Sequence, residues 1–229
     1  MKRLALLVLC LVVGLGSGWA GVTGTTNPAV LVDSVNWCQF GCAQAAYTTP
    51  QPWISLHGNT GLVGNTSAQN WQNLQVGNGW AGGFAANMGL VYNGVSTLGN
   101  APTTIAIYLD QPVYGIGAWI DSNYLGSFTG SLTLLDNNLS PFFSYSVSGV
   151  SDFAFGTAPF IGAYDVTPDI WGAVFDTTAN GVGDHDFAIG TMKLNPIPEP
   201  STLLLVGPSL LGLAGVVRRR LVRKSQEVM

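Results

Sequence analysis

The chain has 229 residues, of which 47% are hydrophobic and 9% charged, and its formal net charge is −4. Seven of its eight basic residues lie in the first three positions or after residue 217, so the stretch 21–197 holds ten aspartates against Lys193 alone, a net charge of −9. A stretch without basic surface cannot hold a phosphate backbone, which excludes nucleic-acid binding.

The N-terminus has the three parts of a secretory signal peptide. Lys2 and Arg3 precede an apolar run from 4 to 13, and small residues follow up to Ala20. This order predicts that residues 1–20 direct export and are cleaved between Ala20 and Gly21. A permanent N-terminal anchor is the alternative, but the run is too short to cross a bilayer unaided.

The exported part contains two cysteines, Cys38 and Cys42. Outside the cytoplasm such a pair predicts a local disulfide, closing a small loop that Gly41 helps to turn. A metal site would need more ligands than two thiols, and redox chemistry would favour a Cys-x-x-Cys spacing. Free thiols or other chemistry are the alternative.

The stretch 58–99 is rich in Asn, Gly and Gln, so we expect long loops there. Trp71 stands between amide side chains and Trp80 lies in a glycine-rich segment. These two rings form a candidate ligand face, because an exposed ring can stack on a sugar while amides bond its hydroxyls. The alternative is burial of both rings in the core. Trp119 and Trp171 lie in apolar strands and are expected in the core.

The composition favours strands, since Val, Ile, Thr and aromatic residues are common while Glu, Lys and Arg are almost absent between 21 and 197. Alternating or continuous apolar runs, separated by turn residues such as 136–138, predict strands at 104–109, 113–120, 127–134, 142–147, 160–164, 170–175 and 187–194. The run 113–120 is apolar on both faces, which indicates a central strand. This spacing predicts one all-β domain over 21–195, a β-sandwich or jelly-roll-like fold.

The densest polar cluster is Asp184-His185-Asp186, just before the last predicted strand. It could hold a structural Ca²⁺ if Asp165 or Asp169 joined it from a neighbouring loop. The alternative is an ordinary turn, and two carboxylates are too few for a site by themselves. We therefore predict no cofactor and no metal ligands, with structural Ca²⁺ as the alternative.

Nothing in the sequence assembles a catalytic centre. The exported part has two histidines, lacks the Gly-x-Ser-x-Gly and His-Glu-x-x-His motifs, and places most aspartates at turns, where they bond the local backbone. We predict no catalytic residues and no enzymatic activity. An exported hydrolase that uses two facing carboxylates is the alternative.

The C-terminus combines three features in a fixed order: Pro198-Glu199-Pro200, an apolar run over 201–217, and a basic cluster of Arg218, Arg219, Arg220, Arg223 and Lys224. A mainly apolar run of seventeen residues is just long enough for a transmembrane helix, and the cations would stay on the cytoplasmic side. That orientation leaves 21–197 outside. A buried helix of a soluble domain is disfavoured by the adjoining cations, and a GPI signal by the basic end of the chain.

Residues 196–224 resemble the PEP-CTERM sorting tail of exported bacterial proteins. The matching parts are the Pro-Glu-Pro motif at 198–200, the helix at about 201–217 and the basic cluster within 218–224; the chain departs by continuing to Met229. The resemblance implies an exosortase as partner, acting near the motif at the inner membrane of a Gram-negative bacterium that makes exopolysaccharide. The protein would then pass to the cell envelope or extracellular matrix.

The second half also resembles β-sandwich ectodomains akin to carbohydrate-binding modules, through 113–120, 160–164, 170–175 and 184–190. Together these features predict a cell-surface or exopolysaccharide-associated protein with a structural or adhesive, non-enzymatic role. A true polysaccharide-binding module is the second hypothesis. The exported hydrolase is the third.

Overall fold

The structure is a computed structural model that describes residues 21–42, 45–65, 71–77, 79–80, 82–93, 104–179 and 186–197. The predicted signal peptide up to Ala20, the Pro198-Glu199-Pro200 motif, the apolar run and the basic cluster lie outside these residues. The described part is all-β. It has two short 3-10 helices, η1 (Pro28–Val30) and η2 (Trp37–Phe40), and in it no helix is long and apolar enough to cross a membrane.

The described strands join into one continuous 14-stranded sheet, in which every pairing is antiparallel except that of β6 with β7. The strands are β1 (Thr23–Thr25), β2 (Asp33–Val35), β3 (Ala45–Tyr47), β4 (Gln51–Ile54), β5 (Thr60–Asn65), β6 (Trp71–Val76), β7 (Gly79–Trp80), β8 (Gly89–Tyr92), β9 (Ile105–Ser122), β10 (Gly126–Leu135), β11 (Pro141–Ser151), β12 (Phe160–Tyr164), β13 (Ile170–Ala179) and β14 (Phe187–Pro196).

The predicted strands of the second half are confirmed, with two differences. The runs 104–109 and 113–120 are parts of the single strand β9, and the runs 142–147 and 170–175 continue, as β11 to Ser151 and as β13 to Ala179. The eight strands before β9 were not predicted, and four of them, β5 to β8, lie within 58–99, where the sequence indicated long loops. They are two to six residues long, and segments this short carry too little periodicity to be recognised.

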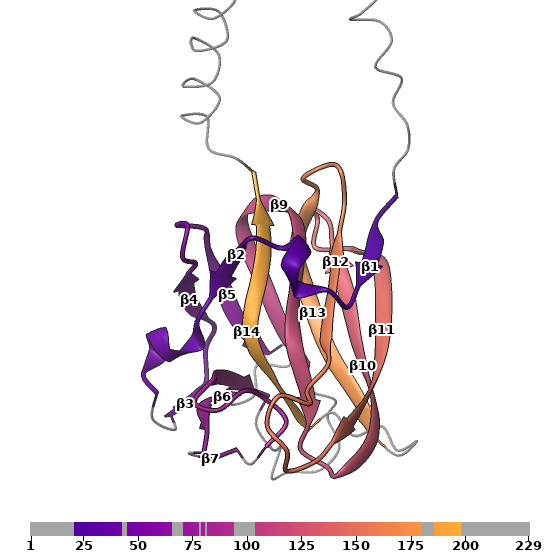
Figure 1. Cartoon of the computed structure of the whole chain (residues 1–229). Helices are drawn as coiled ribbons and strands as arrows, with labels where there is room; N and C mark the ends of the chain where they lie inside the picture. The colour runs from indigo at the N-terminus through magenta and orange to yellow at the C-terminus, as the bar shows by residue number, and fades with distance from the viewer. Residues whose placement is uncertain are drawn as a thin grey trace, which may run out of the picture.

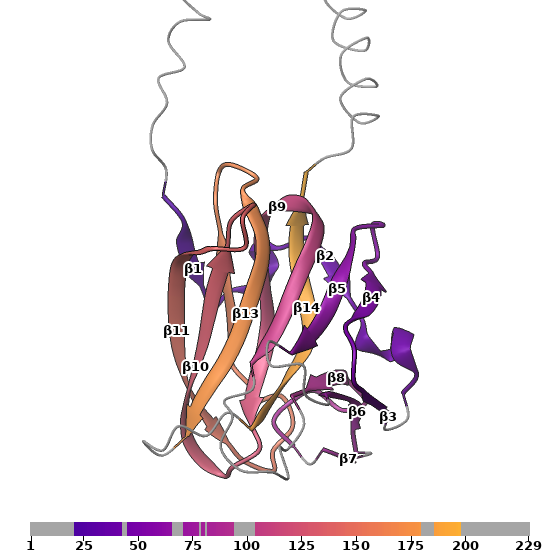
Figure 2. The same ribbon diagram turned by 180° about the vertical axis from the view of Figure 1, so that it is seen from behind.

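Strand β9 folds the sheet over on itself. Its first part, 105–109, pairs with β5 and β13, whereas 115–122 pairs with β14 and, as far as Trp119, with β12. Between them the exposed residues Asp110 and Gln111 form the bend, visible as the arch labelled β9 in Figure 1 and, from behind, in Figure 2. Two layers therefore face each other: β10, β11 and β13 with the first half of β9, and β12 and β14 with the second.

The core lies between these layers. It is built from the inward side chains of both, including Ile107 of β9, Leu132 of β10 and Phe175 of β13 on one side, and Ile116 and Met192 on the other. The layers approach closely: a methyl group added at Gly130 of β10 would lie 2.9 Å from Ile120 Cγ2 of β9. A second, smaller cluster packs around Leu74, Val76, Trp80, Phe84 and Leu90.

Both ends of the described sheet leave it on the same side. Thr23 of β1 pairs with Tyr164, and Pro196 of β14 pairs with Val113, next to the bend of β9. Figure 1 shows the start of β1 and the end of β14 at this end, which we call the tether end. The opposite end, where Phe187 pairs with Ser122 and β9 turns into β10, is called the distal end.

Candidate functional site

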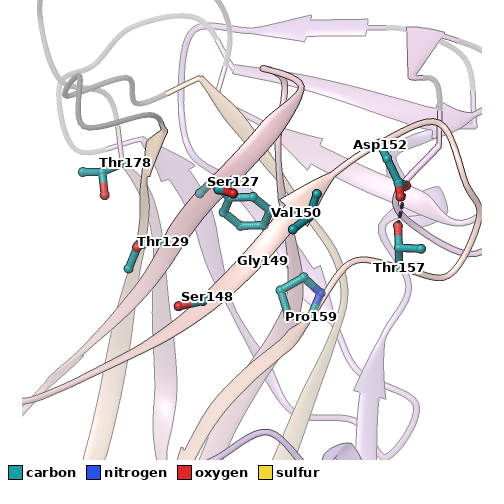
Figure 3. A pocket seen from close by; sticks show the side chains of 10 residues that line it. Ser127, Thr129, Ser148, Gly149, Val150, Asp152, Thr157, Pro159 and Thr178 are labelled. Atoms are coloured by element: carbon teal, nitrogen blue, oxygen red, sulfur yellow. Dashed lines mark hydrogen bonds between the residues drawn. The ribbon is translucent and has the colours of Figure 1, made fainter.

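The distal end carries an open hollow of about 830 Å³. Strands β10, β11 and β13 and the loop that follows β11 supply its lining: Ser127, Phe128, Thr129, Ser148, Gly149, Val150, Asp152, Thr157, Pro159 and Thr178. Figure 3 shows these side chains from close by. Their chemistry is dominated by hydroxyl groups and small apolar surfaces.

Strand register places the hydroxyls side by side. Thr129 of β10 pairs with Ser148 of β11 on one side and with Thr178 of β13 on the other, and all three are exposed. Directly opposite residues in neighbouring strands hold their Cβ atoms about 5 Å apart, so the hydroxyls form a row across the sheet. Such a row can donate and accept hydrogen bonds with a ligand that carries several hydroxyls.

One carboxylate adjoins the row. Asp152 Oδ1 accepts hydrogen bonds from the Ala154 N–H at 2.9 Å and from the Thr157 hydroxyl at 2.9 Å, the latter drawn as a dashed line in Figure 3. These bonds fold the loop after β11 back on itself. The Asp152 side chain is thereby held at the edge of the hollow.

Exposed apolar side chains occur in the chain segments that adjoin the hollow. Val150 lines it directly, and the others lie in the turn before Ser127 or in the loop between Asp152 and Thr157. They are between 46% and 68% exposed: Tyr124, Leu125, Val150, Phe153 and Phe155. Aromatic and aliphatic surface beside hydroxyls is the combination that binds sugars, whose rings have apolar faces and polar edges.

A buried acid lies near the hollow. Asp121 of β9 is 1% exposed, and burial raises the pKa of its carboxyl to about 7; the charge of Asp152 adds to this, while hydrogen bonds from Ser151, the Ser122 N–H and Trp80 act against it. Its Oδ1 has no hydrogen-bond partner in the described part of the chain. A pKa near 7 would suit a general acid. Because the side chain is enclosed, however, a substrate cannot reach it.

The charge of the surroundings limits the ligand. Between 21 and 197 the chain offers one cation from Lys or Arg, and that residue, Lys193, pairs with Gly117 in the half of β14 nearer the tether end. The hollow itself contains a carboxylate and no basic group. It can therefore accommodate neutral or cationic polyhydroxylated molecules and repels anionic ones.

The predicted ligand face at Trp71 and Trp80 is not formed. Trp71 is 1% and Trp80 7% exposed, so neither ring presents a face to a ligand. Trp71 stacks on Tyr47 with ring centroids 4.6 Å apart and donates its Nε1–H to the Thr49 carbonyl, while Trp80 packs edge-on against Tyr92. Strand β6 contributes side chains to both hydrophobic clusters, so it is covered on both faces. Trp71 is therefore buried although its neighbours in the sequence are polar.

The core placement expected for the other two tryptophans holds in part, since Trp119 packs against the second hydrophobic cluster. Trp119 and Trp171 sit in apolar strands but are only half-buried. Trp119 packs edge-on against Phe160, with ring centroids 5.0 Å apart. Both strands are covered on both sides along most of their length, yet these positions fall on faces that remain partly open.

The disulfide between Cys38 and Cys42 is confirmed. It closes the loop formed by η2, whose first residue, Trp37, is fully buried and donates its Nε1–H to the Gly190 carbonyl at 2.7 Å. Gly41 adopts a φ of 93°, the left-handed region that glycine enters without strain, and so allows the predicted turn. The disulfide therefore closes the loop whose Trp37 ring is buried in the core, which indicates a structural role.

The structure separates the residues considered for a calcium site. Asp184 and His185 lie outside the described residues; Asp186 accepts a hydrogen bond from Asn123 at 3.1 Å, at the distal end. Asp165 and Asp169 follow Tyr164, which pairs with Gly115 near the tether end. Gly115 and Ser122 are seven residues apart along β9, roughly 20 Å. The suggestion that Asp165 or Asp169 completes this site is therefore wrong, and the described residues include no group of three potential metal ligands.

A second polar constellation was missed by sequence reasoning. Asp33 of β2 is fully buried and accepts hydrogen bonds from His57 Nδ1 at 2.9 Å, the His57 N–H at 3.0 Å, Asn59 at 2.7 Å and the Ser34 N–H at 2.7 Å. Burial alone would raise its pKa, but bonds from Ser55, Asn59, Ser34 and His57 hold the pKa below its usual value.

Because an ionised Asp33 only accepts, the His57 ring donates from Nδ1 and turns Nε2 away from Asp33, with 57% of the side chain exposed. His57 and Asn59 lie 24 and 26 residues from Asp33 along the chain, so no local sequence motif predicts these contacts. The constellation joins the β4–β5 turn to β2. These hydrogen bonds indicate a structural role, since they hold the turn against the strand.

Comparison with known proteins places the chain in no family. No family model matches it, and no curated protein matches its sequence. Among solved structures, a DUF4465 family protein from Bacteroides caccae ATCC 43185 aligns with 72% of this chain and 100% of its own, at 10% identity and a TM-score of 0.37. The enzymatically active domain of tailspike protein 4 from bacteriophage CBA120 aligns with 77% of this chain and 19% of its own, at 14% identity and a TM-score of 0.27. We draw no functional inference from these distant likenesses.

Proposed function

We propose that the protein is an exported, non-enzymatic surface protein that contacts neutral polysaccharide through the hollow at its distal end. One observation carries this proposal: both ends of the described sheet leave at the tether end, and the hydroxyl-lined hollow lies at the opposite end. A domain held at a membrane by its C-terminal side would present such a hollow outward.

Export and sorting form the first part of the proposal. The signal peptide at 1–20, the Pro198-Glu199-Pro200 motif, the helix at about 201–217 and the basic cluster at 218–224 are all sequence features. We propose that an exosortase-type enzyme recognises this tail at the inner membrane and that the domain then reaches the envelope or matrix. We also propose the sandwich class for the folded-over sheet, a proposal that the two facing layers support.

Mass spectrometry of the protein recovered from the producing cells tests the sorting. A product that begins at Gly21 and lacks the residues after the motif is expected from the wild type. Replacing Pro198, Glu199 and Pro200 by alanine should leave the whole tail attached and the protein in the membrane fraction. A wild-type chain that keeps Met1 and stays in the cytoplasm would contradict export.

Ligand binding forms the second part. The hydroxyl row at Thr129, Ser148 and Thr178, the apolar side chains beside it and the lack of cations support a polysaccharide of neutral or positive charge. This makes the polysaccharide-binding module the better of the two non-enzymatic hypotheses. A hydrolase is not favoured, since the one carboxyl with a pKa near 7 is enclosed.

Calorimetric titration of the exported protein with dextran, galactomannan, chitosan oligosaccharide and alginate tests the ligand class. Saturable binding of at least one neutral or cationic polymer is expected, and no binding of anionic alginate. Thr129→Val removes a hydroxyl from the middle of the row and should weaken binding about tenfold, the effect of one or two lost hydrogen bonds. Thr133→Val, on the same face of β10 but outside the hollow, is the matched control. Preferential binding of alginate would contradict the proposal.

A further inference from the structure

Strand β11 forms an edge of the sheet. It pairs with β10 along its whole length, and no described strand pairs with its other side. An unpaired edge presents a row of backbone N–H and C=O groups to any strand that can approach it. With eleven residues, β11 is among the longest strands of the described sheet.

Proteins usually block such an edge with charges, prolines within the strand or a covering segment. Between Asp136 and Asp152 this chain has no charged residue, and its one proline, Pro141, is the first residue of the strand. The exported part otherwise carries a net charge of −9. The edge is therefore a neutral strip on an anionic domain, where two copies can approach with the least repulsion.

The outward side chains of β11 have a palindromic order. The exposed positions read Phe142, Ser144, Ser146, Ser148 and Val150, and Phe142 and Val150 are 40% and 56% exposed. When two such strands pair antiparallel about Ser146, Phe142 of each lies beside Val150 of the other and Ser144 beside Ser148. Apolar residues then meet apolar residues and hydroxyls meet hydroxyls, the pairings that stabilise antiparallel sheets.

We propose that a second copy of this chain pairs with β11, so that a two-fold axis passes next to Ser146 and the two sheets become one. Two identical edges related by such an axis meet antiparallel, and the contact is self-complementary. Backbone hydrogen bonds supply the contact, and the matched side chains set its register.

Antiparallel pairing of two copies has a consequence for adhesion. This consequence rests on the membrane tether of the proposed function, whereas the pairing itself does not. Pro141 lies towards the tether end and Ser151 towards the distal end, because Leu135 pairs with Gly172 whereas Gly126 pairs with Ser151. Antiparallel pairing therefore inverts one copy relative to the other. Their tether ends point in opposite directions, so the pair would join copies on two facing surfaces.

Disulfide trapping tests the pairing and its register. Ser146→Cys places two thiols next to the two-fold axis, with Cβ atoms about 5 Å apart, close enough to bond. Ser131→Cys, the neighbouring position on β10, is the matched control, since its copies would be about three strand spacings apart, roughly 14 Å. We expect mild oxidation of the exported chain to give a covalent dimer with Ser146→Cys and background levels with Ser131→Cys.

A mixture of the Ser144→Cys and Ser148→Cys chains should also cross-link, whereas each alone should not. Equal yields for Ser146→Cys and Ser131→Cys, or strong cross-linking of Ser144→Cys alone, would overturn the proposed pairing. These assays contain no polysaccharide, so their outcome is separate from that of ligand binding.

A charge at the axis provides the non-covalent test. Ser146→Lys puts two like charges opposite each other, and because the side chain is exposed, we expect the melting temperature to change little. Beads that carry the chain through its C-terminal side should aggregate with wild-type protein and stay dispersed with Ser146→Lys. Dispersed wild-type beads together with efficient trapping of Ser146→Cys would overturn the facing-surface arrangement, and unchanged aggregation of Ser146→Lys would overturn the role of β11.

Discussion

Two buried aspartates influence stability in opposite ways. Asp33 is ionised and receives hydrogen bonds from four residues, whereas Asp121 lies in an environment that favours its protonated form. Both are at most 1% exposed. Asp121 has an oxygen without a hydrogen-bond partner among the described residues and is exposed to the charge of Asp152, whereas Asp33 is surrounded by donors, and this difference predicts opposite pH dependences.

For Asp33 we expect Asp33→Asn to lower the free energy of unfolding at pH 7 by about 2–4 kcal/mol, because the new NH2 group, itself a donor, would face donors that a carboxylate oxygen now accepts from. The wild-type pKa is lowered, so the stabilisation by Asp33 is present at neutral pH and is lost as the pH falls below about 4. Urea unfolding at pH 7 and pH 3 measures both. Asp110→Asn, at an exposed carboxylate in the bend of β9, should change stability by less than about 0.5 kcal/mol.

For Asp121 the pH dependence of stability has the opposite sign. The folded state keeps the proton up to about pH 7, and an unfolded aspartate releases it near 3.8, so between these values the folded state binds more protons. Stability supplied by this group is full below pH 3.8 and is lost as the pH rises to 7. The stability difference between wild type and Asp121→Asn should therefore change by about 3–4 kcal/mol between pH 4 and pH 8 in favour of the variant. A difference independent of pH would contradict the raised pKa.

At the scale of single elements, the centre of β9 depends on close backbone contact. A methyl group at Gly117 would lie 2.7 Å from Gly162 Cα and 2.7 Å from the Ile161 carbonyl oxygen, both on β12. Since backbone atoms cannot yield, we expect Gly117→Ala to destabilise the protein by about 2–4 kcal/mol in thermal or urea unfolding. Gly21→Ala, where no atom lies within 4 Å of the added methyl, is the control and should be neutral.

The sequence predicts the strands of the second half because they are long and regular. Strands β9 to β14 alternate or are continuously apolar over five or more residues, which is enough for periodicity to be recognised. The strands before β9 are shorter and rich in glycine and asparagine. Their burial comes from neighbours far away in the chain, as at Trp71, whose partners come from η2, β3 and Thr49.

The candidate site was less predictable than the fold. The row at Thr129, Ser148 and Thr178 depends on the register of three strands, and no pattern within one segment contains it. Similarly, all donors to Asp33 except the Ser34 N–H come from a turn more than twenty residues away. The disulfide was predictable because its cysteines are four residues apart, so the chain itself brings them together.

On the scale of the whole molecule, the domain has three distinct regions. Both ends of the described sheet lie at the tether end, the hollow lies at the distal end, and β11 runs between them as an edge that no other described strand pairs with. A protein with this arrangement can bind matrix polysaccharide at its distal end and a second copy along β11. The β11 edge is uncharged and the hollow takes neutral or cationic ligands, which suits a domain whose net charge of −9 opposes other anions.

Nuclear magnetic resonance of the isotopically labelled exported protein, titrated with the neutral oligosaccharide that binds best, tests the central claim most directly. The account predicts that amide shifts change around Thr129, Ser148, Asp152 and Thr178, at the distal end, and remain constant around Asp165 and Asp169, at the tether end. Saturable shifts confined to the tether end, or no shifts with any neutral oligosaccharide, would contradict it.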